Sequence, residues 1–412
     1  GPAFATTVLS ITVLAPPSGL SYSKNPATYG TNVAITANTP SVIGTVTHYS
    51  VIPALPSGLL IDSITGVISG SPNAAQAAAS YQVKTENVAG FDTETIVITV
   101  LNAPSGLSYP SVKHWRGVAS SPASPTVTGV VSRYSISPAL PTGLTLDTIT
   151  GVISGTPSVA SPATNYTVTA SNVGGSATAT VNIRVYPPPS ALSYSASPAT
   201  YGVNVVITPN TPNVTDTVTR YSVTLLPAGL TLDTITGVIS GTPTVVSGFA
   251  VYTVTASNPA GSTNSGVSIR VLAAPSSLSY ATSTATYGVN VTIPNDSSTV
   301  TGVVTRYSVA PALPSGLLLD SVTGVISGAA TASSAAANYT ITASNIAGST
   351  TTIVNIRVLA PPSSLSYSQN PATYGVNVSI TDNVAAVTGV VARYSVSPAL
   401  PTGLVLDTVT GK

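Results

Sequence analysis

The sequence predicts an all-β protein built as a tandem array of β-sandwich modules. Three observations carry this prediction. Three short sequence strings recur in step along the chain, apolar and polar residues alternate with a period of two, and Asn, Asp and Gly mark tight turns between the alternating runs. No segment has the 3.6-residue period of an amphipathic helix, so no helix is expected.

The repeat is defined by three strings. Leu-Ser-Tyr recurs at intervals of 87, 85, 86 and 87 residues. Two longer strings keep step with it: Gly-Leu-x-(Leu/Ile)-Asp-x-(Ile/Val)-Thr-Gly, and Tyr-x-(Val/Ile)-x-x-(Ser/Glu)-Asn-x-x-Gly. A fixed period of about 86 residues indicates one folding unit used repeatedly. The tyrosines of the first string are Tyr22, Tyr109, Tyr194, Tyr280 and Tyr367.

These markers divide the chain into four whole modules and two incomplete ones. Proline-rich joints separate the modules, because proline fixes φ and removes a backbone donor, which ends a sheet. The predicted parts are 1–15, the closing strand of a preceding module; 16–102, module 1; 103–187, module 2, which diverges most; 188–273, module 3; 274–360, module 4; and 361–412, a partial module.

Strands are expected wherever small apolar residues alternate with Thr, Ser, Asn or Arg. In module 2, Tyr166, Val168 and Ala170 alternate with polar residues, and a second alternating run covers 178–185. This period of two buries one face of a strand and leaves the other in water, and β-branched residues suit the pleated surface. About seven short strands per module, separated by frequent turn signals, are typical of a two-sheet sandwich.

Tight turns are expected between these strands. The string Asn172-Val173-Gly174-Gly175 and its copies place Asn at the start of a reversal and Gly at its end. One hairpin earlier, a recurrent Asp begins a turn that also ends in Gly. We expect its carboxylate to cap the N–H groups of the turn rather than to bind Ca²⁺, which needs six to eight oxygens and usually several carboxylates. These residues are Asp62, Asp147, Asp233, Asp320 and Asp407.

The composition excludes several classes of function. Only 6% of the 412 residues are charged, and 12 basic residues against 11 acidic ones give a net charge of +1. Neither a basic surface for nucleic acid nor an apolar stretch of the ~20 residues that a membrane helix needs is present, so we expect no nucleic-acid partner and no membrane insertion. The chain contains no Cys. Its two histidines, His48 and His114, lie in different modules, so no catalytic grouping, metal or cofactor is expected.

A longer string in each module carries a family resemblance. In module 2 it reads LPTGLTLD over 140–147, GVISGTP over 151–157 and YTVTASN over 166–172. It resembles the immunoglobulin-like tandem repeat of bacterial surface proteins, which is related to cadherin-like and dystroglycan-type modules. The resemblance covers all four modules and both partial ones. It implies an immunoglobulin-like β-sandwich in each module, a place in large secreted, surface-attached proteins, and no catalytic chemistry.

One segment of module 2 departs from the repeat and is the candidate for contact with a ligand or partner. Module 2 has Lys113, His114, Trp115 and Arg116 where the other modules have Ala-Thr-Tyr-Gly, and it is two residues shorter here. Trp beside Arg and His is typical of a recognition surface. The alternative is a degenerate repeat in which the tryptophan takes the place of the tyrosine.

The sequence favours a non-catalytic structural role, as a component of an extracellular or cell-surface rod or filament. Its partners would be further modules or other copies of the chain. Two alternatives stay open. In an adhesin or glycan-binding stalk, exposed arginines on recurring strands and the divergent segment of module 2 would contact surface glycans. In a spacer attached to a secreted enzyme, the catalytic domain would lie outside this sequence.

The two partial modules lead to a hypothesis of head-to-tail assembly. Residues 4–14 carry Leu9, Ile11 and Val13 on one face, and they would complete the segment 361–412 of another copy by strand addition. Such a contact does not close on itself and produces a filament. Together the two segments fall about 19 residues short of one period, and the simpler alternative, that a longer chain was cut here, stays open.

Overall fold

The computed structural model describes residues 4–412, and every regular element in that range is a β-strand. The chain falls into two compact units. One holds modules 1 and 2 with two loops of module 3, Thr215–Thr219 and Ser257–Ser262, and the other holds the remainder. None of the described segments forms a helix that would be long and apolar enough to cross a membrane. The prediction of an all-β chain is therefore confirmed for the described residues.

Module 1 shows the architecture that the other modules repeat. Its main sheet has the strand order β2-β8-β7-β4, and two smaller pairs, β1-β3 and β5-β6, complete it. The first strand of the main sheet, β2, runs parallel to the last, β8, while β8-β7 and β7-β4 are antiparallel. The strands are β1 (Ser18–Tyr22), β2 (Ala27–Gly30), β3 (Pro40–Ile43), β4 (His48–Ile52), β5 (Leu59–Ile61), β6 (Ile68–Gly70), β7 (Gln76–Asn87) and β8 (Gly90–Leu101).

Modules 2 and 3 keep this order, with main sheets β10-β17-β16-β13 and β19-β25-β24-β21. Module 2 contains β9 (Ser105–Ser108), β10 (His114–Trp115), β11 (Ser120–Ala123), β12 (Thr126–Thr128), β13 (Arg133–Ser137), β14 (Leu144–Leu146), β15 (Ile153–Gly155), β16 (Ser161–Asn172) and β17 (Gly175–Tyr186). Module 3 contains β18 (Ser190–Tyr194), β19 (Ala199–Gly202), β20 (Pro212–Thr215), β21 (Arg220–Val223), β22 (Leu230–Leu232), β23 (Ile239–Gly241), β24 (Ser247–Asn258) and β25 (Gly261–Leu272).

Module 4 has the main sheet β27-β33-β32-β29, whereas the partial module 361–412 has one strand pair, β34-β35. The strands are β26 (Ser276–Tyr280), β27 (Thr284–Gly288), β28 (Ser298–Thr301), β29 (Arg306–Ala310), β30 (Leu317–Leu319), β31 (Ile326–Gly328), β32 (Ser334–Asn345), β33 (Gly348–Leu359), β34 (Ser363–Tyr367) and β35 (Ala385–Thr388). Residues 1–3 of the predicted segment 1–15 lie outside the described residues, and residues 4–14 form no strand, since none pairs with them.

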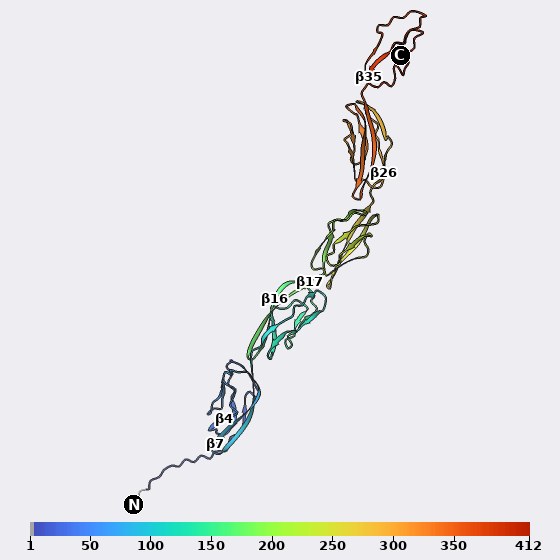
Figure 1. The fold of residues 1–412 in the computed structure, drawn as a ribbon. Helices are drawn as coiled ribbons and strands as arrows, with labels where there is room; N and C mark the ends of the chain where they lie inside the picture. The colour runs from blue at the N-terminus through green and yellow to red at the C-terminus, as the bar shows by residue number, and fades with distance from the viewer. Residues whose placement is uncertain (1–3) are drawn as a thin grey trace. The chain divides into compact units, whose positions relative to one another are not determined.

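Each main sheet is built around one long antiparallel hairpin. In module 2 this is the hairpin β16-β17, labelled in Figure 1. Its register runs from Ser161 opposite Val185 to Asn172 opposite Gly175. The predicted alternation is present: Tyr166, Val168 and Ala170 are buried, while the residues between them lie on the solvent-facing side of the sheet. The sequence pattern therefore sets which face of the sheet meets the core.

The core of each module lies between the main sheet and the smaller strand pairs. In module 1 it combines Leu20 of β1, Leu59 of β5, Ile68 of β6 and Val83 of β7. Ile68 is completely buried, and its counterparts in the other whole modules are at most 1% exposed. These counterparts are Ile153, Ile239 and Ile326. Each such isoleucine contributes about 1.5–3 kcal/mol relative to an exposed side chain, so a module has a core of its own without disulfides.

Two of the recurring strings meet in space. The tyrosine of Leu-Ser-Tyr donates its hydroxyl hydrogen to the carbonyl oxygen of the glycine that ends the Asp turn, about 43 residues later. In module 2 this bond joins Tyr109 to Gly151 at 2.6 Å, and burial raises the pKa of Tyr109 to about 12, which keeps the donor protonated. The same bond joins Tyr22 to Gly66, Tyr194 to Gly237 and Tyr280 to Gly324.

Candidate functional site

The divergent segment of module 2 forms the short strand β10 and the residues that flank it. Lys113 and Arg116 are exposed, Trp115 is half-buried and His114 is only 3% exposed. The four candidate residues therefore do not share one surface. His114 faces the core, and the other three lie at or near the solvent.

The pairing of β10 shows which residue replaces the tyrosine of the other modules. His114 is opposite Val185 on β17, just as Tyr29 is opposite Val100 on β8. His114 therefore occupies the tyrosine position, and the alternative in which tryptophan takes the place of the tyrosine is wrong. Trp115 stands instead at the position of a glycine, Gly30 in module 1.

His114 serves the core rather than a surface site. Its Nδ1 lies 2.8 Å from the hydroxyl oxygen of Ser120 on β11, the next strand along the chain, and this hydrogen bond satisfies one ring nitrogen. Burial lowers the pKa of His114, so the imidazole is held in its neutral form. A small hydrogen-bonded ring thus fills the place that a tyrosine ring fills elsewhere.

Trp115 forms an aromatic pair on the water-facing side of the main sheet. Its ring centroid lies 5.0 Å from that of Tyr186, with 38° between the ring planes. The guanidinium carbon of Arg184 lies 4.5 Å from the centroid of the Tyr186 ring, a cation–π contact. The alternation along β17 explains the arrangement, because Ile183 and Val185 point into the core and leave Arg184 and Tyr186 outside.

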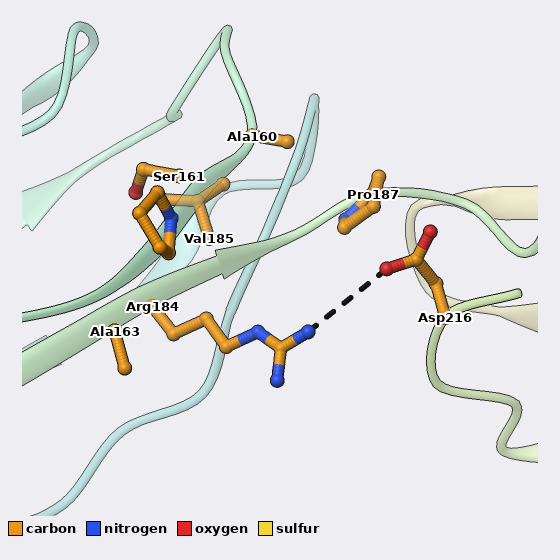
Figure 2. Close-up of a pocket in the computed structure, with 8 residues that line it drawn as sticks. Ala160, Ser161, Ala163, Arg184, Val185, Pro187 and Asp216 are labelled. Carbon is orange, nitrogen blue, oxygen red and sulfur yellow. Dashed lines mark ion pairs between the residues drawn. The ribbon is translucent and has the colours of Figure 1, made fainter.

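Arg184 also borders a hollow in the same compact unit. One of its terminal nitrogens lies 3.9 Å from Oδ1 of Asp216, across a hollow of about 360 Å³ (Figure 2). Asp216 has φ of 72°, a conformation that favours glycine, and the equivalent turn residue of modules 1 and 2 is indeed glycine, Gly44 and Gly129. The acidic residue at this turn is therefore particular to the site beside Arg184.

The five recurrent aspartates lie in turns and use their carboxylates on backbone N–H groups. Oδ1 of Asp147 accepts hydrogen bonds from the N–H groups of Ile149 and Thr150, at 2.8 and 2.9 Å. These bonds hold the pKa of Asp147 below its ordinary value, and the same holds for Asp62, Asp233, Asp320 and Asp407. Between residues 4 and 412 no three His, Cys, Asp or Glu side chains gather into a possible metal site.

The asparagine of each Asn-x-x-Gly turn has a second role that the sequence did not indicate. In module 2, Nδ2 of Asn172 donates to the carbonyl oxygens of Asn102 in the preceding linker and of Val130 in a loop, at 2.7 and 2.8 Å. Its Oδ1 accepts from the N–H of Gly174 at 2.7 Å. Asn87, Asn258 and Asn345 make the same three bonds. We call this arrangement the asparagine clamp.

The clamp ties the linker that enters a module to that module's closing hairpin. The only sequence signal for it is the recurrence of Asn in the third string, which turn formation alone already explains. Its two acceptors lie 70 and 42 residues away from Asn172, so local patterns contain no trace of them.

The family comparison agrees with this architecture. The family model described as "Putative Ig domain" matches the chain four times, over residues 6–101, 110–186, 182–273 and 271–359. The chain belongs to this family. A comparison with curated proteins found no match.

Solved structures with tandem immunoglobulin domains are similar to this Ig-domain chain at low identity. "Sidekick-1 immunoglobulin domains 1-5" is 14% identical, with a TM-score of 0.34, and the match covers 84% of this chain and 81% of that one. The "I-band fragment I67-I69 from titin" is 18% identical, with a TM-score of 0.31, covering 62% of this chain and 98% of that one. The likeness concerns the fold alone.

Proposed function

We propose that this chain is a load-bearing, non-catalytic structural component that acts outside the cell. The observation that carries the proposal is the parallel pairing of the strand near the start of each module with the strand that ends it. These pairs are β2-β8, β10-β17, β19-β25 and β27-β33.

Parallel pairing determines how tension acts on a module. A force applied through the two linkers pulls the first strand of the main sheet backwards and the last strand forwards along their common axis. All hydrogen bonds of the parallel ladder are then loaded together, whereas an antiparallel pair at the same place would open one bond at a time. A module built in this way resists extension, and a series of such modules transmits force.

The placement outside the cell rests on other features. The resemblance to repeats of bacterial surface proteins favours a secreted, surface-attached chain. Few charged residues, 6% of the chain, leave few sites for proteases that cut at Lys or Arg, which suits an exposed protein. Surface localisation of this protein is tested by labelling intact cells with an antibody raised against module 1. A signal that requires permeabilised cells would contradict the proposal.

Extension of the full chain between two handles in a single-molecule force experiment tests the load-bearing role. We expect discrete unfolding events, each lengthening the chain by roughly 240–280 Å, the length of about 86 extended residues less that of a folded module. A smooth extension at low force, without separate events, would show that the modules do not resist tension.

A finer proposal concerns assembly by strand donation. In module 4, Ile353–Leu359 lies within β33, and its last five residues pair with β27; residues 8–14 are similar in sequence to this stretch. In the partial module, residues 372–375 correspond to the first strand of a main sheet but form no strand, and residues 4–14 expose Val8, Leu9, Ile11 and Val13. We propose that residues 4–14 of one copy pair with residues 372–375 of the next, as a parallel closing strand.

Deletion of residues 1–14 tests this finer proposal. We expect the deleted chain to remain monomeric under conditions in which the full chain forms oligomers, as measured by light scattering and electron microscopy. The control is Val8→Ser, Ile11→Ser in the full-length chain, which keeps its length but lowers its apolar content. Equal assembly of the full and deleted chains would exclude strand donation and leave the load-bearing role untouched.

A further inference from the structure

We infer that module 2 carries a binding site for an acidic glycan, a polysaccharide whose sugars bear carboxylates. The site is formed by Trp115, Tyr186 and Arg184 together with the hollow beside Arg184. This inference goes beyond the load-bearing role, which needs no ligand.

The aromatic pair supplies the apolar part of the site. Trp115 and Tyr186 lie on neighbouring parallel strands, and their rings lie 5.0 Å apart at an angle of 38°. The C–H groups of one face of a pyranose ring are apolar and pack on aromatic rings, which combine a large contact area with a polar edge. Since both side chains are on the water-facing side of the sheet, a sugar chain can reach them without unfolding the module.

Arg184 supplies the charged part. Its guanidinium is held over the Tyr186 ring, and its separation of 3.9 Å from Asp216 is too long for a hydrogen bond. Within residues 4–412 this guanidinium forms an ion pair with Asp216 but donates no hydrogen bond, so its N–H groups can still donate to a ligand. A planar guanidinium fork matches the two oxygens of a carboxylate, and a preordered one binds it at a smaller entropic cost.

A shallow, open hollow beside Arg184 adds to the site. It measures about 360 Å³ and is lined by Ala160, Ser161, Pro162, Ala163, Val185 and Pro187, with Arg184 and Asp216 on its border (Figure 2). This volume is at the lower end of the range for small-molecule pockets, and a single sugar residue fits it. Charged groups at the edge of a largely apolar wall fix the orientation of the ligand.

The other modules serve as an internal comparison. Module 4 has an equivalent hollow of about 300 Å³ beside Arg357, but it has Leu359 and Gly288 where module 2 has Tyr186 and Trp115. Module 3 has Arg270 over Phe249 at 4.7 Å, and its Nε donates to the Thr200 hydroxyl, so that arginine is already engaged. Among residues 4–412, only module 2 combines two aromatic rings, a guanidinium without hydrogen bonds and a hollow.

An acidic glycan fits this site better than a nucleic acid or an acidic protein. Nucleic acids require rows of basic residues, and the chain as a whole carries a net charge of only +1. One guanidinium beside a tilted pair of aromatic rings and a one-residue hollow matches a polymer with one carboxylate per sugar and apolar ring faces.

The chain's only tryptophan is Trp115, so its fluorescence reports directly on the site. We would titrate the full chain with tetragalacturonate and, separately, with the neutral maltotetraose. We expect a saturable change in emission with tetragalacturonate at a Kd of about 0.1–1 mM, weakening as salt is added, and none with maltotetraose. No change up to 10 mM tetragalacturonate, or an equal response to maltotetraose, would overturn the inference.

Three variants distinguish binding at this site from a general attraction of the anionic glycan to the arginines of the chain. Arg184→Gln and Tyr186→Leu should each weaken binding about tenfold. Tyr186→Leu introduces the residue that module 4 has at this position, Leu359. Arg357→Gln, the matched control, should leave binding unchanged. If Arg357→Gln weakened binding as much as Arg184→Gln, the inference would be wrong. Circular dichroism checks the fold of each variant, and Arg184→Gln alone decides the matter if Tyr186→Leu fails to fold, because Arg184 is a surface side chain.

Discussion

The asparagine clamp makes a strong quantitative prediction about module stability. In Asn172→Ala, module 2 loses three hydrogen bonds at once, of 2.7, 2.8 and 2.7 Å. Each such bond contributes about 0.5–1.5 kcal/mol net, so the free energy of unfolding of module 2 should fall by about 2–4 kcal/mol. The chain offers a matched control in Asn182→Ala, since Nδ2 of Asn182 makes a single exposed bond to Oδ1 of Asn165 across the same hairpin.

Hydrogen–deuterium exchange of the full chain measures this loss in one module while the others act as internal standards. A loss of 2–4 kcal/mol raises the population of the open state about 30- to 1000-fold. Peptides from β16 and β17 should therefore exchange faster by that factor in Asn172→Ala, with peptides from β32 and β33 unchanged. Asn182→Ala should change exchange less than about fivefold. If the two variants exchanged alike, the clamp would not stabilise the module and the reasoning would be refuted.

Three further predictions concern single residues. Asp296, 7% exposed, stands where modules 1 and 3 have Asn38 and Asn210, whose Nδ2 atoms donate to backbone carbonyls. Burial raises the pKa of Asp296, so its favourable contribution to folding is present at low pH and is lost as pH rises through that pKa. Asp296→Asn should therefore stabilise module 4 by about 1 kcal/mol at pH 7 and by less at pH 3.5, and an equal gain at both would contradict this. The turn aspartates behave oppositely, because their pKa values are lowered in the folded protein. Their contribution to the free energy of unfolding is present above the ordinary pKa of Asp and is lost as pH falls through the lowered pKa. The melting temperatures of Asp147→Ala and the unmodified chain should therefore converge towards pH 2. Tyr109→Phe removes the 2.6 Å bond to the Gly151 oxygen and should lower the stability of module 2 by about 1–2 kcal/mol in denaturant unfolding, whereas an unchanged midpoint would exclude a role for that bond.

The fold was predictable from the sequence because its signals are local. Alternation along 166–171 sets the buried face of β16, and the Asp and Asn turns mark where strands reverse. Each signal acts over fewer than ten residues and recurs in every module, so repetition makes it easy to recognise.

The site was harder to predict because it depends on contacts between distant residues. Trp115 and Tyr186 are 71 positions apart, and their contact follows from the register of a parallel ladder that no local pattern encodes. Module 2 has two residues fewer than the other modules before His114, so its segment Lys113–Arg116 does not align residue for residue with their Ala-Thr-Tyr-Gly. As a result His114, rather than Trp115, lies at the tyrosine position.

The order in which the modules unfold under force tests the load-bearing account most directly. The parallel ladder of module 2 has two residue pairs, those of modules 1 and 3 have four, and that of module 4 has five. If this ladder bears the load, module 2 unfolds at the lowest force. A chain in which residues 103–187 are replaced by a second copy of 274–360 should then lose its weakest unfolding event, while the other events keep their forces. An unchanged weakest event after this replacement would contradict the account.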